Sequence, residues 1–512
     1  MRIPHTVTEN IFQAYRCSAE TASLPNELRR TLYSEDQKWD ERSPPDLKIF
    51  ALRAIVSVWK DNPIFEELPT CTDRDILVEM LPTDLPFELT ITKIVNDHYW
   101  ERAAKDRWSH NDPNEHDKSW RRLYCERHLS EYLENLEASY FEPQQDDCMR
   151  LVELVKEHVH VLKLRALVPT KKQPEHSTAP GTVQEDIVEH IPMSVILPQL
   201  PHLTEISFNV GMIYMNDGFE WRDFEFSVQD CVNLGVGLKA CKNLEKFSLT
   251  RSNLDRVRAA ALLQNLVEHK SLKELDFSHC KLSDSGAHAV AEFTSLYRRL
   301  KVLRLTNNDI GAEGVAGIVY ALVGRSVVAL QHLDLGLNPL CDTGGSHICA
   351  LLLRNKHIEI LNINGCELSS SIGEAIADIF ESGDINVPTF QINVSNNDFG
   401  PEVGRMFEKI VKFHSNIIGL DVRMCNFTRD SEFSIGQSIL RNKQRRAKRR
   451  ASSSIPRETM LPSLSRLWTS DKYSEEATAI DDDTLTVLTP RLNQHESKSS
   501  LFSDETKQNG GD

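Results

Sequence analysis

Three consecutive residues in the first third of the chain, Glu126, Arg127 and His128, are of types that take part in acid–base catalysis. A carboxylate and an imidazole can take up and release protons near neutral pH. Catalysis by such groups also needs a reacting partner, and no nucleophile motif accompanies the triplet. We therefore expect these side chains to form local salt bridges.

Histidines and cysteines suggest two places where a metal ion could bind. His158 and His160 are two residues apart, which on the predicted helix turns them to different faces. Cys341 and Cys349 flank another predicted helix with His347 between them, yet no C-x-x-C pair accompanies them. We expect packed or solvated side chains at both places and no metal site.

No sequence motif of an enzyme or a cofactor-binding protein is present. The chain lacks a P-loop, a nucleophile elbow, an H-E-x-x-H motif and the kinase signatures. The sequence therefore predicts a protein that is not an enzyme and has no cofactor.

The strongest pattern is a repeat. Seven segments between residues 244 and 427 share an apolar L-x-x-L-x-L core, followed two residues later by Asn, Cys or Ser and then by an apolar residue. This pattern is typical of leucine-rich repeats. The polar position falls at Ser252, Cys280, Asn308, Asn338, Cys366, Asn397 and Cys425, with spacings of 28, 28, 30, 28, 31 and 28 residues.

Each repeat predicts one strand and one helix. In LKVLRLTNNDI, the apolar side chains of Leu303 and Leu305 point inward while Arg304 and Thr306 point outward. A segment with helical spacing and many small residues follows each strand. We expect an α/β leucine-rich-repeat solenoid, similar to ribonuclease inhibitor, preceded by a small all-α domain. The polar position should hydrogen-bond to the backbone inside each turn.

Capping elements should close the array at both ends. PHLTEISFNV at 201–210 is a degenerate first repeat, and an aromatic insertion with Phe219, Trp221, Phe224 and Phe226 follows it. At the other end, residues 430–450 predict a helix that starts apolar and ends strongly basic.

The segment before the repeats contains five of the seven tryptophans and apolar residues at helical spacing. It predicts helices that include 88–108, 119–137 and 147–167. We expect an N-terminal extension (1–45), a helical domain (46–168), a linker (169–190), a leucine-rich-repeat domain with capping elements (191–440), and a basic helix end with a disordered tail (441–512).

Composition limits where the protein works. No run of 18 apolar residues is present, the N-terminus lacks the apolar stretch of a secretory signal, and the eleven cysteines show no disulfide pattern. These features predict a protein of the cytoplasm that binds no membrane. The net charge is −16, but residues 441–450 carry seven basic side chains. This run is interpreted as a helix end that complements its own dipole, as a dock for an acidic partner, or as a nuclear-import or nucleic-acid patch.

The open face of the predicted sheet is polar, of mixed charge and without aromatic residues. Among its residues only Arg304 and Arg423 are of the types that usually anchor protein interfaces. Candidate partner contacts are Trp100, Trp108, Trp120, Trp221, Arg304, Arg423, Arg445, Arg446, Arg449 and Arg450.

Several segments outside the repeat core resemble one family, dynein regulatory complex subunit 5, also known as T-complex-associated testis-expressed protein 1. They are LPTDLPFEL (81–89), YWERAAKDRW (99–108), SWRRLYCERHLSEYLE (119–134), GFEWRDFEFSVQDCVNL (218–234), LKACKNLEKFSLTRSNLD (238–255) and LDVRMCNFTRDSEFSIGQSILRNK (420–443). Residues 1–45 and the tail after 450 match nothing in the family.

The resemblance implies a structural subunit of the nexin link in the axoneme of motile cilia and flagella, a part of the cytoskeleton. Such a subunit joins doublet microtubules and regulates sliding driven by dynein. Its partners would be other subunits of the dynein regulatory complex, and its basic helix could face acidic coiled coils, doublet microtubules or tubulin tails. Nucleic acid is not expected as a partner, because no aromatic residues interleave with the basic run.

Two other functions stay open. The LP start and late tryptophan of residues 81–108 resemble an F-box, and F-box proteins with leucine-rich repeats are substrate adaptors of ubiquitin ligases. The SWRR and ERHL segments have no place in an F-box. A nuclear repeat protein that uses residues 441–450 for import is the third interpretation.

Overall fold

The computed structural model describes residues 46–453 except 137, 168, 173–186, 212–223, 325–329, 383–386 and 388. The predicted extension 1–45, the tail from 454 and Trp221 lie outside the described residues. No helix in the described part of the chain is both long enough and apolar enough to span a bilayer.

Helices form the first part of the described chain, as the sequence predicts. Buried Trp59, Tyr99 and Trp100 contribute to their core. The segment 88–108, predicted as one helix, is two helices, because Asn96 accepts a hydrogen bond from the His98 N–H and begins a new helix. The helices are α4 (Leu47–Val58), α5 (Cys71–Met80), α6 (Phe87–Lys93), α7 (Asp97–Arg107), α8 (Trp120–Asn135) and α9 (Phe141–Val155), with short 3-10 turns at Pro113–His116 and Ala138–Tyr140.

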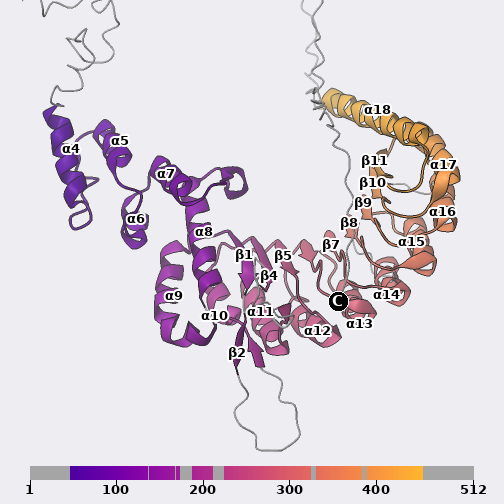
Figure 1. Cartoon of the computed structure of the whole chain (residues 1–512), viewed down its shortest axis with the longest axis horizontal. Helices are drawn as coiled ribbons and strands as arrows, with labels where there is room; N and C mark the ends of the chain where they lie inside the picture. Colours follow the sequence, from indigo (N-terminus) through magenta and orange to yellow (C-terminus); the bar gives the residue numbers. More distant parts are fainter. Residues whose placement is uncertain are drawn as a thin grey trace, which may run out of the picture. The chain divides into compact units, whose positions relative to one another are not determined.

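A parallel sheet of nine strands follows the helices, with its strands in the order β1-β4-β5-β6-β7-β8-β9-β10-β11. The strands line the inner side of the repeats and the helices cover their outer side (Figure 1). They are β1 (Val161–Leu167), β4 (Glu205–Val210), β5 (Lys246–Thr250), β6 (Glu274–Asp276), β7 (Val302–Arg304), β8 (His332–Asp334), β9 (Ile360–Asn362), β10 (Phe390–Asn393) and β11 (Ile417–Asp421). A separate antiparallel hairpin pairs β2 (Thr170–Lys172) with β3 (Ile187–Glu189).

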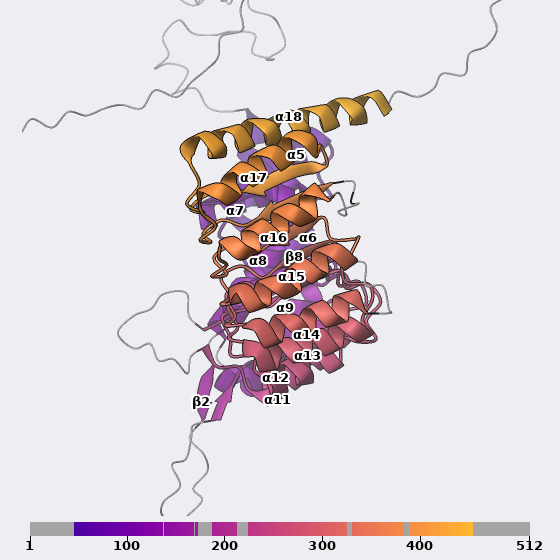
Figure 2. The same ribbon diagram turned by 90° about the vertical axis from the view of Figure 1, so that its right-hand side faces the viewer.

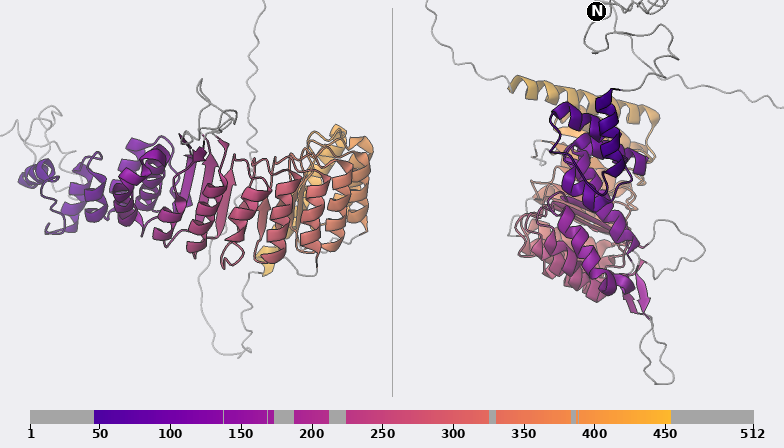
Figure 3. Two further views of the ribbon diagram at one scale, coloured as in Figure 1. Left: turned by 90° about the horizontal axis from the view of Figure 1, so that it is seen from below. Right: turned by 90° about the vertical axis from the view of Figure 1, so that its left-hand side faces the viewer.

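The repeat helices stack side by side in chain order (Figures 2 and 3). Small residues allow this close approach: a Cβ at Gly314 would lie 2.6 Å from Asp284 Oδ1 and 3.0 Å from Ala287 Cβ. The helices are α10 (Met193–Ile196), which continues into a 3-10 turn (Leu197–Gln199), α11 (Val228–Ala240), α12 (Arg256–Gln264), α13 (Ser283–Leu296), α14 (Ala312–Val323), α15 (Cys341–Arg354), α16 (Ser370–Glu381), α17 (Gly400–Phe413) and α18 (Arg429–Ser453). The predicted α/β leucine-rich-repeat solenoid is confirmed.

The Asn and Cys side chains at the polar position of the repeats form the expected backbone contacts. The buried Ser252 hydroxyl forms none within the described residues. Asn338 is fully buried; its amide nitrogen donates to the Leu305 and Leu335 carbonyls, and its amide oxygen accepts from the Asn308 N–H. Cys280 supplies only the donor part of these contacts, since its thiol donates to the Leu249 carbonyl at 3.0 Å. Burial raises the pKa of the Cys280 thiol to about 12, which keeps it a donor.

A second helix prediction was also wrong. The sequence suggested a single helix over 147–167, but α9 ends at Val155 and residues 161–167 form β1, the first strand of the sheet. Leu162 and Leu164 are buried while Lys163 and Arg165 are exposed, which is the two-residue period of a strand. The sheet therefore begins before residue 168, where we expected the helical domain to end. The division into domains stays a proposal.

Candidate functional site

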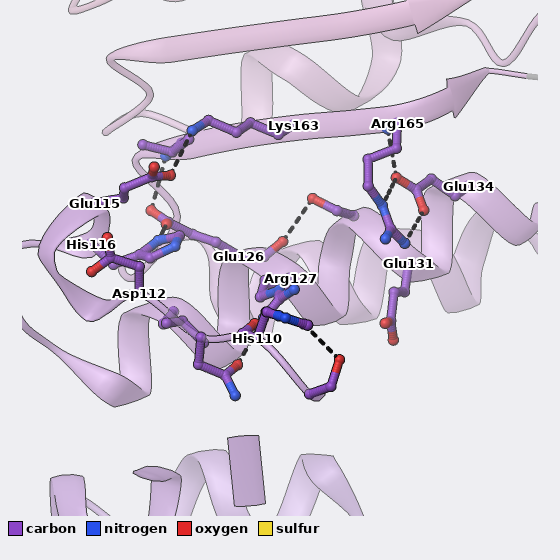
Figure 4. A pocket seen from close by; sticks show the side chains of 15 residues that line it. His110, Asp112, Glu115, His116, Glu126, Arg127, Glu131, Glu134, Lys163 and Arg165 are labelled. Atoms are coloured by element: carbon purple, nitrogen blue, oxygen red, sulfur yellow. Dashed lines mark hydrogen bonds and ion pairs between the residues drawn. The ribbon is translucent and has the colours of Figure 1, made fainter. Parts of the chain in front are cut away.

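Glu126, the first residue of the candidate catalytic triplet, joins α8 to the start of the sheet (Figure 4). It is 2 % exposed. Its Oε1 accepts the N–H groups of His160 at 2.7 Å and Val161 at 2.9 Å, and the Arg122 Nε at 2.8 Å. Its Oε2 pairs with the His116 ring. Both oxygens are occupied, so the arrangement supports anchoring of the strand.

A second carboxylate on α8 repeats this contact eight residues later. Glu134 Oε1 accepts the Arg165 N–H at 2.6 Å, and Oε2 pairs with the Arg165 guanidinium at 3.1 Å. Eight helical residues rise about 12 Å and four strand residues about 13 Å, so the two spacings match. Helix α8 therefore covers the outer edge of β1, and its carboxylates accept N–H groups that an edge strand would otherwise expose.

The other two members of the triplet have separate roles. The Arg127 guanidinium lies 4.7 Å from the Trp108 ring centre and donates to the His110 carbonyl at 2.7 Å. The His128 ring lies 4.2 Å from that of Phe87, and burial, helped by the charge of Arg107, lowers the pKa of His128 to about 4. The three side chains thus contact different neighbours, and they do not converge on one reacting atom.

A hollow of about 660 Å³ opens between α8, the loop before it and β1. Asp112, Glu115, Lys163 and Arg165 are among its lining residues (Figure 4). Lys163 pairs with Glu115 at 2.9 Å. The hollow is lined by charges of both signs that largely neutralise one another.

The candidate contact tryptophans have different environments. Trp100 is 1 % exposed and its indole N–H donates to the Ile94 carbonyl, so it is a core residue and we no longer propose it as a contact. Trp108 is half-buried with Arg107 and Arg127 near its ring, and Trp120 is half-buried with the Lys105 ammonium 5.5 Å from its ring centre. Trp108 and Trp120 remain proposals.

The two predicted anchors on the open face of the sheet are paired with neighbours. Arg304 lies 3.4 Å from Glu274 on the adjacent strand, and Arg423 lies 2.6 Å from Asp421. The hydrogen bond from Arg423 lowers the pKa of the Asp421 carboxyl. Arg423 is nonetheless 82 % exposed at its side chain. Partner binding by Arg304 and Arg423 stays a proposal.

Helix α18 closes the last repeat. Ile435 and Ile439 are buried, and the amide nitrogen of Asn442 donates to the Val411, His414 and Ile417 carbonyls. A second hollow of about 640 Å³ lies between α18 and strands β8–β11.

The basic end of α18 extends beyond these contacts. No side chain described after Asn442 in this helix is buried. Arg445 is exposed and Arg446 is half-buried, while the side chains of Arg449 and Arg450 lie outside the described part. The predicted helix that starts apolar and ends basic is thus present as α18.

The candidate metal ligands do not form a cluster. Cys341 is exposed, with its thiol 3.5 Å from Glu367 Oε2, and Cys349 is half-buried. His158 and His160 lie after the end of α9 rather than on a helix, and the His160 ring lies 5.6 Å from that of His202. Within the described residues, no three His, Cys, Asp or Glu side chains are placed to hold a metal ion.

Comparison with known proteins supports the architecture. A family model described as leucine-rich repeat matches residues 268–291, 299–319 and 354–377. Pig ribonuclease inhibitor is 22 % identical over 241 residues, 40 % of this chain and 52 % of its own. The array is a leucine-rich-repeat solenoid.

Similarity to named proteins agrees with the resemblance seen in the sequence. Mouse dynein regulatory complex subunit 5 is 31 % identical over 278 residues, 52 % of this chain and 55 % of that protein. The protein of the same name from Chlamydomonas reinhardtii is 24 % identical over 212 residues, 41 % of this chain and 48 % of its own. The expected resemblance is confirmed, and the chain spans about half the length of the curated relatives it matches.

Proposed function

We propose that this chain is a non-catalytic structural subunit of a dynein regulatory complex in the axoneme of motile cilia and flagella. It contributes to the link between doublet microtubules and to the control of dynein-driven sliding, through contacts with other subunits. The observation that carries the proposal is the similarity to proteins named dynein regulatory complex subunit 5 from mouse and from an alga. A leucine-rich-repeat solenoid suits such a role.

Retention in the axoneme tests this proposal directly. We expect the tagged full chain to stay with detergent-extracted axonemes and to leave them at high salt. A chain found entirely in the detergent-soluble fraction would contradict the ciliary function.

The basic end of α18 supports the proposal for an acidic partner, such as an acidic coiled coil or a tubulin tail. Like charges four residues apart on one helix, such as Arg441 and Arg445, repel each other. An acidic partner would remove this repulsion, and its attraction would weaken with salt.

Replacing the seven basic residues of 441–450 by Gln should release the chain from axonemes at a lower salt concentration, because the variant forms fewer ionic contacts for salt to screen. The measurement is the salt concentration that extracts half of the chain. A matched control removes seven exposed charges elsewhere: Lys242, Lys270, Arg298, Arg354, Lys356, Lys409 and Lys412. Equal extraction profiles of the two variants would refute the role of the basic helix.

The F-box alternative has a direct test. Helix α7 packs on α8, and α8 packs on β1, so the F-box-like segment is continuous with the solenoid. We expect no binding of the full chain to the adaptor subunit of the ubiquitin ligase in a pull-down. Stoichiometric binding there would favour the substrate adaptor.

A further inference from the structure

The outer face of α18 carries an apolar stripe opposite its buried side. Ile435, Ile439 and Asn442 face the solenoid, while Phe433 is 70 % and Leu440 is 53 % exposed. These two side chains are seven residues apart, two turns of helix or about 10 Å. We call this surface, formed by Phe433 and Leu440, the α18 stripe.

An apolar outer face is unusual at this place in the fold. The last element of a repeat array normally has a polar outer face, because no further repeat covers it. Helix α18 is the last helix of the row (Figure 2). Phe433 and Leu440 are both exposed. The stripe is therefore open to a partner.

The charges beside the stripe select the partner. Arg441, Lys443, Arg445 and Lys448 follow the stripe toward the C-terminal end of the helix, and the structure shows each of these side chains exposed. Two apolar anchors seven residues apart match the heptad spacing of an amphipathic helix. Cations next to them favour carboxylates on that helix.

We propose that the α18 stripe binds an acidic amphipathic helix from another subunit. Apolar residues of that helix, spaced by seven, contact Phe433 and Leu440, and its acidic residues lie beside Arg441 and Arg445. This inference rests on the proposed function, in which the basic end of α18 meets an acidic partner. It adds that the partner is helical and held by apolar contacts.

Binding of two synthetic peptides to the full chain tests the inference. The first is a 28-residue helix with Leu at heptad positions a and d and Glu at e and g; the second has Ser in place of every Leu. The double variant F433Q/L440Q should weaken binding of the Leu peptide by about tenfold or more, since apolar anchors dominate such interfaces. The salt dependence of the remaining affinity should not change, because the variant keeps every charge.

Phe413→Gln is the matched control, because Phe413 on α17 is 83 % exposed but lies on another helix. Equal thermal midpoints for wild type and all variants establish that the fold is kept. Equal affinity for the Leu and Ser peptides would overturn the inference, as would an unchanged affinity of F433Q/L440Q. If the Leu peptide bound only after removal of residues 454–512, the chain's own acidic tail would be the occupant, and the assignment to another subunit would fall.

Axoneme retention separates this inference from the proposed function. If the seven-Gln variant is released at lower salt while F433Q/L440Q is retained like wild type, the acidic contact stands and helix docking is wrong. Earlier release of both variants supports both statements. If neither variant changes extraction, both are overturned.

Discussion

Buried carboxylates hold the first strand of the sheet in place. Glu126 and Glu134 accept N–H groups from β1, and neither contact depends on a reaction. A carboxylate of this kind resembles a catalytic group by type, but its hydrogen bonds to the backbone fix one strand position. The same chemistry that makes Glu126 a candidate base in the sequence therefore makes it an anchor in the fold.

Glu126→Gln should lower the free energy of unfolding by about 3 kcal/mol, because one buried partner of Arg122 and His116 loses its charge. The midpoint of urea unfolding measures the effect. Glu153→Gln is the control, since Glu153 forms an exposed pair with Lys156 and should change stability by less than about 0.5 kcal/mol. Equal midpoints for the two variants would show that the Glu126 contacts are weak.

Single residues were only partly predictable from the sequence. The polar position of the repeats was predictable, because seven segments share its spacing and each turn has backbone groups that need a hydrogen-bond partner. The role of Trp100 was not predictable, because an indole side chain at helical spacing is equally suited to a core and to a contact with a partner. What covers a helix face is decided by tertiary packing, and a single sequence carries no record of it.

At the level of elements, the spacing of apolar residues gave a wrong prediction where a helical pattern runs into a strand pattern. Residues 162–166 alternate between apolar and charged, yet the apolar helix before them made a continued helix plausible. The strand forms because it can pair with β4 and receive α8 on its other edge, and both contacts come from distant segments. The end helix α18, by contrast, was predictable from its own composition.

Asn442 is the side chain that fixes this end helix to the solenoid. Asn442→Ala should cost about 2 kcal/mol, because buried carbonyls of α17 and β11 would lose their donor. Hydrogen exchange of the α18 amides should become faster in the variant. Gln444→Ala, exposed two residues later, is the control, and equal exchange in both variants would contradict the role of Asn442.

At the level of the whole molecule, the helices before the repeats and the sheet share contacts through α8 and β1. We expect one cooperative unfolding transition, because β1 contacts α8 on one edge and β4 on the other and so links the helices to the repeats. Tryptophan fluorescence follows the helices, because Trp59, Trp100, Trp108 and Trp120 lie in or next to them, and far-UV circular dichroism follows the repeats. Coincident urea curves are the expected result, and two separate midpoints would favour independent domains.

The strand order gives the molecule a fixed internal length. Eight strand spacings of about 4.8 Å separate β1 from β11, roughly 40 Å along the sheet. The edge of β1 is covered by α8, so the array cannot grow on that side, and α18 ends it on the other. If the proposed partners bind at the two ends of the solenoid, the number of repeats, rather than any one contact, determines how far apart they are held.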